Sequence, residues 1–199
     1  MQTDKFTALV RNAVLAAQND ALAANHQKIT AMHLLRALLA DDNVTVRSLI
    51  GRAGGDLDGL SAALDKALAA IPSVTGSGAD QLQIDMDLAR VLQAAEGDSK
   101  TLGDSFLAVD ALLLAMVRSK GEIGRILARS GLDAGRVATA IAEMRKGRTV
   151  DSAAAEEGYE ALSKFTTDVT DAARRGKLDP VIGREAEVRR TIQILARRT

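Results

Sequence analysis

Apolar residues in the first 147 positions recur at intervals of three and four, which is the spacing of one buried face of an α-helix. In the opening segment Phe6, Val10, Ala13, Val14 and Ala17 share such a face. The pattern predicts four short helices on each side of a Pro/Gly/Ser-rich connector at 71–80. Their segments lie at 6–17, 29–39, 46–55, 56–68, 87–96, 106–117, 122–132 and 136–144.

The two sets of four helices are copies of each other. A shift of 77 residues pairs Leu35 with Leu112 and Gly54 with Gly131. It also pairs Arg52 with Arg129, and one offset holds over about fifty residues without a gap. We therefore predict an all-α domain over residues 1–147, built as a pseudo-twofold pair of four-helix units.

The copies differ where their second helices begin. In the first copy Thr30 is a good N-cap residue with apolar Ile29 before it. The second copy has Leu107 in place of that threonine. We therefore expect this helix to be capped by Asp104 or Ser105.

Beyond residue 147 the pattern weakens. Residues 148–160 lose large apolar side chains and gain small and acidic ones, which is typical of a linker that is helical at most in part. Residues 161–199 become amphipathic again. After Gly183 a helix is expected with Val188, Ile192 and Leu195 on one face.

Composition supports helices and narrows the possible functions. Apolar residues make up 47% of the 199 positions, but aromatic residues only 2%, which favours close helix packing over a sheet. With 26 basic and 26 acidic residues, net charge gives no reason to expect binding to nucleic acid or to membranes. There is no cysteine, and the apolar run 111–117 is too short to span a bilayer. We expect a protein of the cytoplasm.

Candidate catalytic and metal-binding residues are few. His26 and His33 lie seven positions apart with no further histidine or cysteine, so structural histidines are favoured over a metal site or acid–base pair. No nucleophile motif is present. The phosphate-binding motif G-x-x-x-x-G-K-[ST] is also missing, because the only Gly-Lys pair, Gly176–Lys177, is followed by Leu178. We expect no catalysis and no metal site in this chain.

The C-terminal sequence "KFTTDVTDAARRGKLDPVIGREAEVRRTIQILARRT" (164–199) resembles the start of the first nucleotide-binding module of Clp-type AAA+ ATPases. The helical repeat, with "FTALVRNAVLAAQ" and "HLLRALL", resembles the N-terminal domain of the ClpB-type disaggregases in that family. The resemblance covers essentially the whole chain. It implies that residues 161–199 are the truncated start of an AAA+ module, and that the sequence is the N-terminal piece of a longer ATPase.

The resemblance also implies site residues. Val181 and Ile182 correspond to residues that lie against adenine in the complete module. Thr7, Asp104 and Asp110 match positions associated with substrate engagement. For these three the structural alternatives are helix capping for Thr7, loop solvation for Asp104 and a favourable charge in a first helical turn for Asp110.

Family likeness further implies a parent protein that binds ATP and Mg²⁺ as a homohexamer. Such a parent extracts unfolded or aggregated polypeptides together with a DnaK-type chaperone in the heat-stress response, whereas this chain alone is expected to be a monomer. A second reading is the N-domain of a ClpC- or ClpA-type unfoldase, which docks adaptors and feeds a peptidase. A third is a free-standing interaction module.

Overall fold

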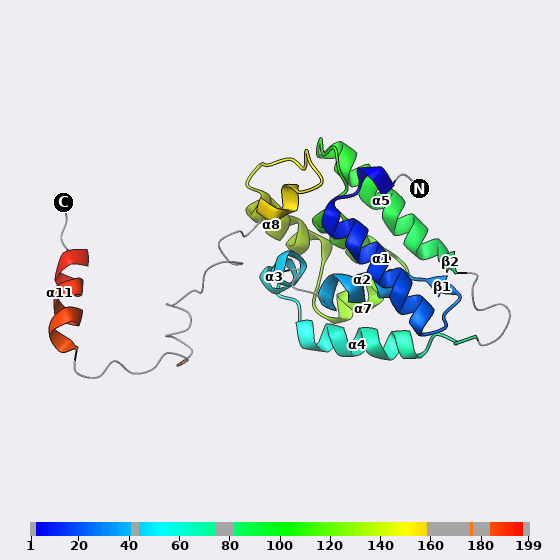
Figure 1. Ribbon diagram of the computed structural model, residues 1–199, viewed down its shortest axis with the longest axis horizontal. Coiled ribbons are helices and arrows are strands. Elements are labelled where there is room, and N and C mark those ends of the chain that lie inside the picture. Colours follow the sequence, from blue (N-terminus) through cyan, green and yellow to red (C-terminus); the bar gives the residue numbers. More distant parts are fainter. Residues whose placement is uncertain (1–2, 41–43, 75–81, 159–175, 177–183, 197–199) are drawn as a thin grey trace. The chain divides into compact units, whose positions relative to one another are not determined.

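The computed structural model describes residues 3–40, 44–74, 82–158, 176 and 184–196 (Figure 1). The chain divides into two compact units, Met1–Ala161 and Leu162–Thr199. Each unit is described by itself below.

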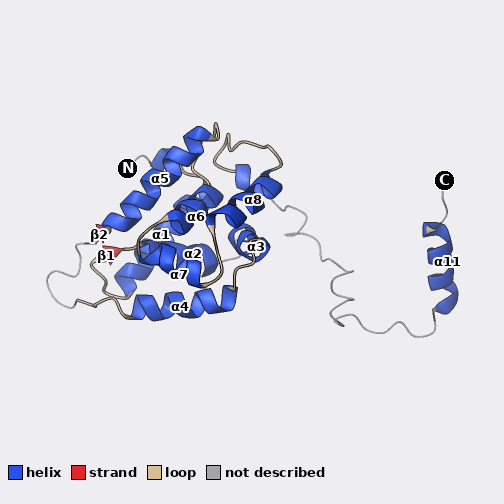
Figure 2. Cartoon of the chain, turned by 180° about the vertical axis from the view of Figure 1, so that it is seen from behind, coloured by secondary structure: helices blue, strands red, loops and turns tan. Residues whose placement is uncertain are grey.

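The first unit is helical, as predicted (Figure 2). The short 3₁₀ helix η1 (Thr3–Lys5) leads into the first copy of the repeat, and the second copy begins after the connector. The helices of the first copy are α1 (Ala8–Ala23), α2 (Ala31–Ala40), α3 (Val44–Arg52) and α4 (Leu57–Ala69). Those of the second are α5 (Met86–Thr101), α6 (Val109–Arg118), α7 (Glu122–Arg129) and α8 (Ala134–Arg145).

The 77-residue repeat is confirmed in local structure as well as in helix order. Asp56 caps α4 by accepting a hydrogen bond from the Gly59 amide, and its counterpart Asp133 caps α8 in the same way. Gly54 and Gly131, the other matched pair, have φ angles of 78° and 83°, a region that favours glycine. The two copies therefore turn at equivalent residues.

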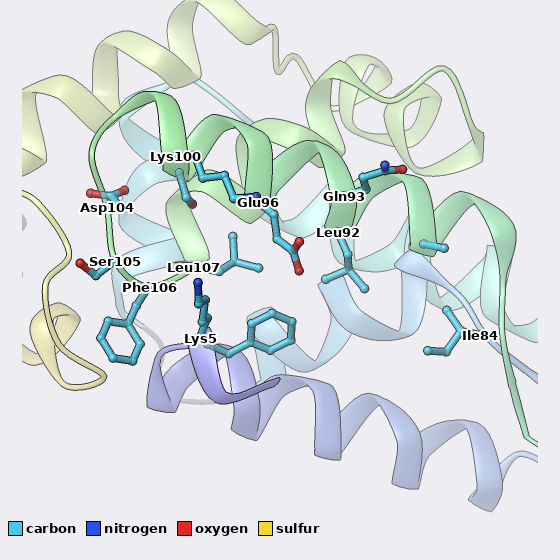
Figure 3. A pocket seen from close by; sticks show the side chains of 13 residues that line it. Lys5, Ile84, Leu92, Gln93, Glu96, Lys100, Asp104, Ser105, Phe106 and Leu107 are labelled. Atoms are coloured by element: carbon cyan, nitrogen blue, oxygen red, sulfur yellow. The ribbon is translucent and has the colours of Figure 1, made fainter. Parts of the chain in front are cut away.

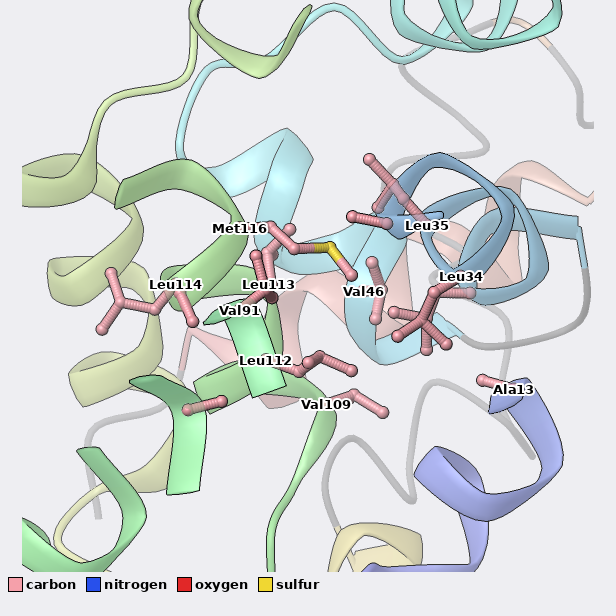
Figure 4. Packing of buried hydrophobic residues seen from close by; sticks show 14 of the residues in the cluster. Ala13, Leu34, Leu35, Val46, Val91, Val109, Leu112, Leu113, Leu114 and Met116 are labelled. Carbon is pink, nitrogen blue, oxygen red and sulfur yellow. The ribbon is translucent and has the colours of Figure 1, made fainter. Parts of the chain in front are cut away.

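The core is centred on α2 and α6, which are contributed by opposite copies. The apolar face of α2 is buried, with Leu34, Leu35 and Leu38 in the core. Nearly the whole of α6 is buried as well. Figure 4 shows Met116 and Leu112 of α6 on the side that faces α2 and α3. Since each copy supplies one central helix, neither can bury its apolar face without the other.

Two short extended contacts join the copies near their starts. Strands β1 (Lys28–Ile29) and β2 (Gln83–Ile84) pair in parallel. A single parallel bridge joins Phe6 to Leu107. Under the 77-residue shift Phe6 corresponds to Gln83 and Leu107 to Thr30, whereas Gln83 pairs with Lys28. The bridge is therefore the reciprocal of the β1–β2 contact, with a register that differs by two residues.

The segment expected to be a linker packs against the first unit over its described part, residues 148–158. Val150 is fully buried, and its carbonyl accepts hydrogen bonds from the amides of Ser105 and Phe106. The Ala153 carbonyl accepts from the Ala8 amide at 2.8 Å, and the short helix η2 (Ala155–Gly158) follows. One apolar residue and a few backbone groups are enough to hold this small-residue segment against the domain.

In the second unit the structure describes α11 (Glu185–Leu195), which confirms the helix expected after Gly183. Its acidic residues Glu185 and Glu187 lie in the first turn, as the helix dipole favours. Val181 and Ile182 lie outside the described residues, so their predicted place beside adenine stays a prediction. Among the helices that the structure describes, none has the length and apolar character needed to cross a membrane.

Candidate binding groove

A groove of about 720 Å³ runs along α5 in the first unit. Figure 3 shows it between α5 and the start of α1, with Ile84 at one end and Asp104, Ser105 and Phe106 at the other. The side chains from α5 recur every three or four residues, because one helix face forms a whole wall. They are Ala89, Leu92, Gln93, Glu96, Ser99 and Lys100.

The floor of the groove is apolar and its rim is polar. Phe6, Leu92 and Leu107 are at most 4% exposed and form the floor. Ile84 remains 48% exposed at the end of the groove. Charges of both signs stand on the rim, among them Lys5. This combination suits an apolar ligand with a polar backbone more than a single small charged molecule.

Ser99 adds an unusual polar group to the wall. It is 4% exposed, and its hydroxyl has no hydrogen-bond partner among the residues that the structure describes. Other helix hydroxyls, such as those of Thr101 and Thr139, donate to the carbonyl four residues earlier. The Ser99 hydroxyl therefore differs from these in making no such bond within its helix.

Behind the end of the groove lies a buried charge cluster. Arg145, at the end of α8, donates through Nε and Nη2 to both carboxylate oxygens of Asp110 at 2.5 and 2.7 Å. Its Nη1 donates to Asp104 at 2.7 Å. The Asp110 and Asp104 side chains are 0% exposed and that of Arg145 is 7% exposed. Burial by itself would lower the pKa of Arg145, but hydrogen bonds and negative charge from Asp110 and Asp104 raise it.

Glu156 lies beside this cluster and caps α6. Its Oε1 accepts a hydrogen bond from the Val109 amide at 2.7 Å, across 47 positions of sequence. The expected caps, Asp104 and Ser105, do not supply this bond, and the N-cap residue Ala108 has no side chain able to accept it. The prediction of a local cap was therefore wrong, because Asp104 is bound to Arg145 and to the Val150 amide instead.

Burial raises the pKa of Glu156 to about 7, and the charge of Asp110 acts in the same direction. Hydrogen bonds from Thr7 and from the Val109 amide, and the charge of Arg145, lower it by less. Glu156 is 1% exposed, and its Oε2 has no partner among the described residues. A carboxyl group with a pKa near neutral therefore joins the end of the domain to the starts of α1 and α6.

The first copy has a different arrangement at the start of α2. The Thr30 amide donates to Nδ1 of His33 at 3.1 Å, so that nitrogen carries no proton. Nε2 of His33 then donates to Nδ1 of His26 at 2.9 Å. Burial lowers the pKa of His33 to about 4, helped by the nearby charge on His26 and Arg36. These are structural histidines, and the described residues contain no group of three or more potential metal ligands.

The residues predicted to engage substrate come together in the structure. Thr7 is 0% exposed and accepts a hydrogen bond from the Val10 amide as the N-cap of α1. Asp104 lines the groove, but its carboxylate accepts hydrogen bonds from Arg145 and from the Val150 amide. Asp110 is buried. Thr7 and Asp110 are not among the residues that line the groove, and the carboxylate of Asp104 is already hydrogen-bonded inside the domain. In this conformation their influence on the groove is through its shape.

Sequence reasoning did not find Arg145, Glu156 or the groove residues of α5. Leu92 belongs to the buried core as well as to the groove, since it is 4% exposed. Nothing in the sequence links Glu156 to Val109, because the contact depends on how the whole domain closes. The period of three to four along α5 was the one available signal for its outer face.

Residues 5–130 match the model of the Clp repeat (R) N-terminal domain. The chain belongs to this family. Over its full length it is also 45% identical to the chaperone protein ClpB of Rhodopseudomonas palustris and 46% identical to that of Mesorhizobium japonicum. All of this chain is aligned, but only 23% of each ClpB sequence, so the chain spans about a quarter of the length of these relatives.

Solved structures agree on the fold. The Hsp104 N-terminal domain from Candida albicans matches with a TM-score of 0.68 at 22% identity, covering 76% of this chain and 98% of that one. A ClpV N-domain in complex with a VipB peptide matches with a TM-score of 0.57 at 21% identity, covering 75% and 91%. At these identities the likeness concerns the fold alone.

Proposed function

We propose that the first unit binds extended, apolar segments of unfolded or aggregated polypeptides in the groove along α5. The observation that carries the proposal is the apolar floor of Phe6, Leu92 and Leu107 beneath a polar rim. An unfolded chain offers apolar side chains with polar backbone between them. A folded protein has buried most of its large apolar side chains and offers few such segments.

The length of the groove fits a short extended segment. Between Met86 and Thr101, α5 is 16 residues long, or about 24 Å at the usual helical rise. A strand of about seven residues spans that distance.

The relatives support a proposal for the wider role. We propose that this chain serves as the substrate-binding N-terminal part of a ClpB-type disaggregase of the cytoplasm. The parent would be a hexameric ATPase that uses ATP and Mg²⁺ and cooperates with a DnaK-type system. Identity to ClpB proteins along the whole chain supports this proposal over a ClpC- or ClpA-type role. The chemistry of ATP belongs to the parent, since the 199 residues lack the phosphate-binding motif.

A charge placed in the groove tests the binding site. Ala89 is exposed on α5 and lines the groove, whereas Ala94 is exposed on the same helix outside it. With Ala89→Glu, affinity for a reduced and alkylated, permanently unfolded protein should fall about tenfold, because a carboxylate must be desolvated beside the apolar floor. The matched variant Ala94→Glu should bind within about twofold of the unmodified chain.

Binding is measured by fluorescence anisotropy of the labelled unfolded protein, with its native, folded form as the comparison. Equal affinity for the folded and unfolded forms would contradict the proposal. So would equal losses in Ala89→Glu and Ala94→Glu, since the groove would then have no special part in binding.

A further inference from the structure

Residues 148–158, named the strap from here on, supply bonds to both copies of the repeat. The Ala153 carbonyl accepts from the Ala8 amide in the first turn of α1. Glu156 accepts from the Val109 amide in the first turn of α6. One short segment therefore caps the first helix of one copy and the second helix of the other.

The strap also forms the backing of the groove. The Val150 carbonyl accepts from the amides of Ser105 and Phe106 at 3.0 and 3.2 Å, and the Val150 amide donates to Asp104 at 2.9 Å. Asp104, Ser105 and Phe106 all line the groove. The Asp104 amide donates to the Ser99 carbonyl of α5, but the amides of Ser105 and Phe106 are bound by Val150. Departure of the strap therefore leaves these two amides of the wall without their partner.

The site that receives Glu156 already holds one more negative than positive charge, so it is poorly suited to a further one. Facing its carboxyl group are the Thr7 hydroxyl before α1, the Val109 amide and Asp110 of α6, and Arg145 of α8. Arg145 is already shared by Asp110 and Asp104. One guanidinium group thus faces two carboxylates before Glu156 is counted, and an ionised Glu156 would leave an excess of two negative charges in a buried place.

We propose that the strap is releasable, that protonated Glu156 fastens it, and that its docking holds the groove in the shape that binds polypeptide. The effect on binding rests on the function proposed above. The fastening itself rests on the contacts of the strap. Occupancy of the groove and docking of the strap are then linked, because a ligand that needs the docked wall also favours the docked strap.

The direction of the pH effect follows from linkage. Glu156 titrates near pH 7 when docked and near the usual pH 4.5 when released. Below pH 4.5 both forms are protonated and docking is tightest. Between pH 4.5 and 7 the released form loses its proton first, so the opening equilibrium rises about tenfold per pH unit. Above pH 7 it is constant.

Amide hydrogen exchange of the full 199-residue chain tests the fastening. After correction for the intrinsic pH dependence of exchange, the amides of Ala8, Ser105, Phe106 and Val109 should open together, about tenfold more for each unit from pH 5 to 7. In Glu156→Gln, which keeps an acceptor but cannot ionise, the opening should not vary with pH. Independent opening of these amides, or an equal slope in Glu156→Gln, would overturn the proposal.

A second pair of variants tests the link to the groove. Val150→Asp removes the buried anchor, while Thr149→Asp places the same charge on the exposed neighbour. The chain has three phenylalanines, of which Phe6 and Phe106 line the groove, so fluorophenylalanine labelling gives few ¹⁹F signals. In Val150→Asp the Phe106 signal should move and affinity for unfolded protein should fall about fivefold or more. Thr149→Asp should leave both unchanged.

The outcomes separate the two proposals. If Val150→Asp frees the strap but the Phe106 signal and the affinity stay as in the unmodified chain, the link to the groove is wrong. If the unmodified chain binds no unfolded protein at any pH, the proposed function fails. The exchange and ¹⁹F measurements would then still decide whether the strap is fastened by Glu156 and shapes the groove.

Discussion

The helices α2 and α6 occupy equivalent places in the two copies, yet they begin in opposite ways. At the start of α2 the Thr30 amide donates to Nδ1 of His33, three residues on. Its counterpart under the 77-residue shift, the Leu107 amide, donates to the distant Lys5 carbonyl, and the Val109 amide at the start of α6 donates to Glu156, 47 residues away. The first copy therefore bonds this part of the backbone locally, and the second copy bonds it to distant segments.

The 77-residue shift shows where the chemistry diverged. It places His33 opposite Asp110, Leu68 opposite Arg145, and Gln27 opposite Asp104. A histidine, a leucine and a glutamine in one copy correspond to an ion cluster in the other. The two copies of the repeat keep the same backbone positions, but their buried polar residues differ because each copy has different contact partners.

The largest effect is expected from making the second copy resemble the first at one position. Arg145→Leu leaves the carboxylates of Asp104 and Asp110 buried without a cation, so the free energy of unfolding should fall by about 3–5 kcal/mol. Urea unfolding followed by circular dichroism measures the loss. Adding Asp104→Asn and Asp110→Asn should restore at least half of it; a triple variant as unstable as Arg145→Leu would show that the charges are not the cause.

A smaller effect is expected from removing the ionisable cap of α6. The raised pKa of Glu156 makes its contribution to stability complete below about pH 4.5 and progressively lost as the pH rises to about 7. Glu156→Gln should therefore be more stable than the unmodified chain at pH 8 by about 2–3 kcal/mol and close to it at pH 4.5. Urea unfolding at the two pH values checks this, and a difference independent of pH would contradict it.

The smallest effect concerns the cap of α2. Because the folded pKa of His33 is lowered to about 4, its contribution is complete above the usual value of 6.5 and lost as the pH falls towards 4. His33→Gln should remove an acid-dependent loss on the order of 1–2 kcal/mol. Thermal unfolding between pH 4.5 and 7 measures it.

In the last two variants, His33→Gln and Glu156→Gln, the free energy of unfolding should change with pH in opposite directions. Between pH 4.5 and 6.5 the contributions of His33 and Glu156 largely cancel in the unmodified chain. Stability should fall with rising pH in His33→Gln and with falling pH in Glu156→Gln. If the stability of both variants changed in the same direction with pH, the contrast between the two copies would be wrong.

Periodicity was sufficient to predict helices α1 to α8, because burial of one helix face is a local property of sequence. The repeat also placed matched turns at Gly54 and Gly131 correctly. The strap was predicted as a linker, since its single large apolar residue, Val150, gives no period at all. The partners of Asp104 and Asp110 could not be predicted either, because Arg145 reaches them across 41 and 35 positions.

The hydrogen bond between Ala153 and Ala8 has a mechanical consequence. Any pull on the chain beyond residue 158 reaches the strap before it reaches the helices of the core. We therefore expect the strap bonds at Ala8, Phe106 and Val109 to bear the load first, and α2 and α6 to stay packed while those bonds break.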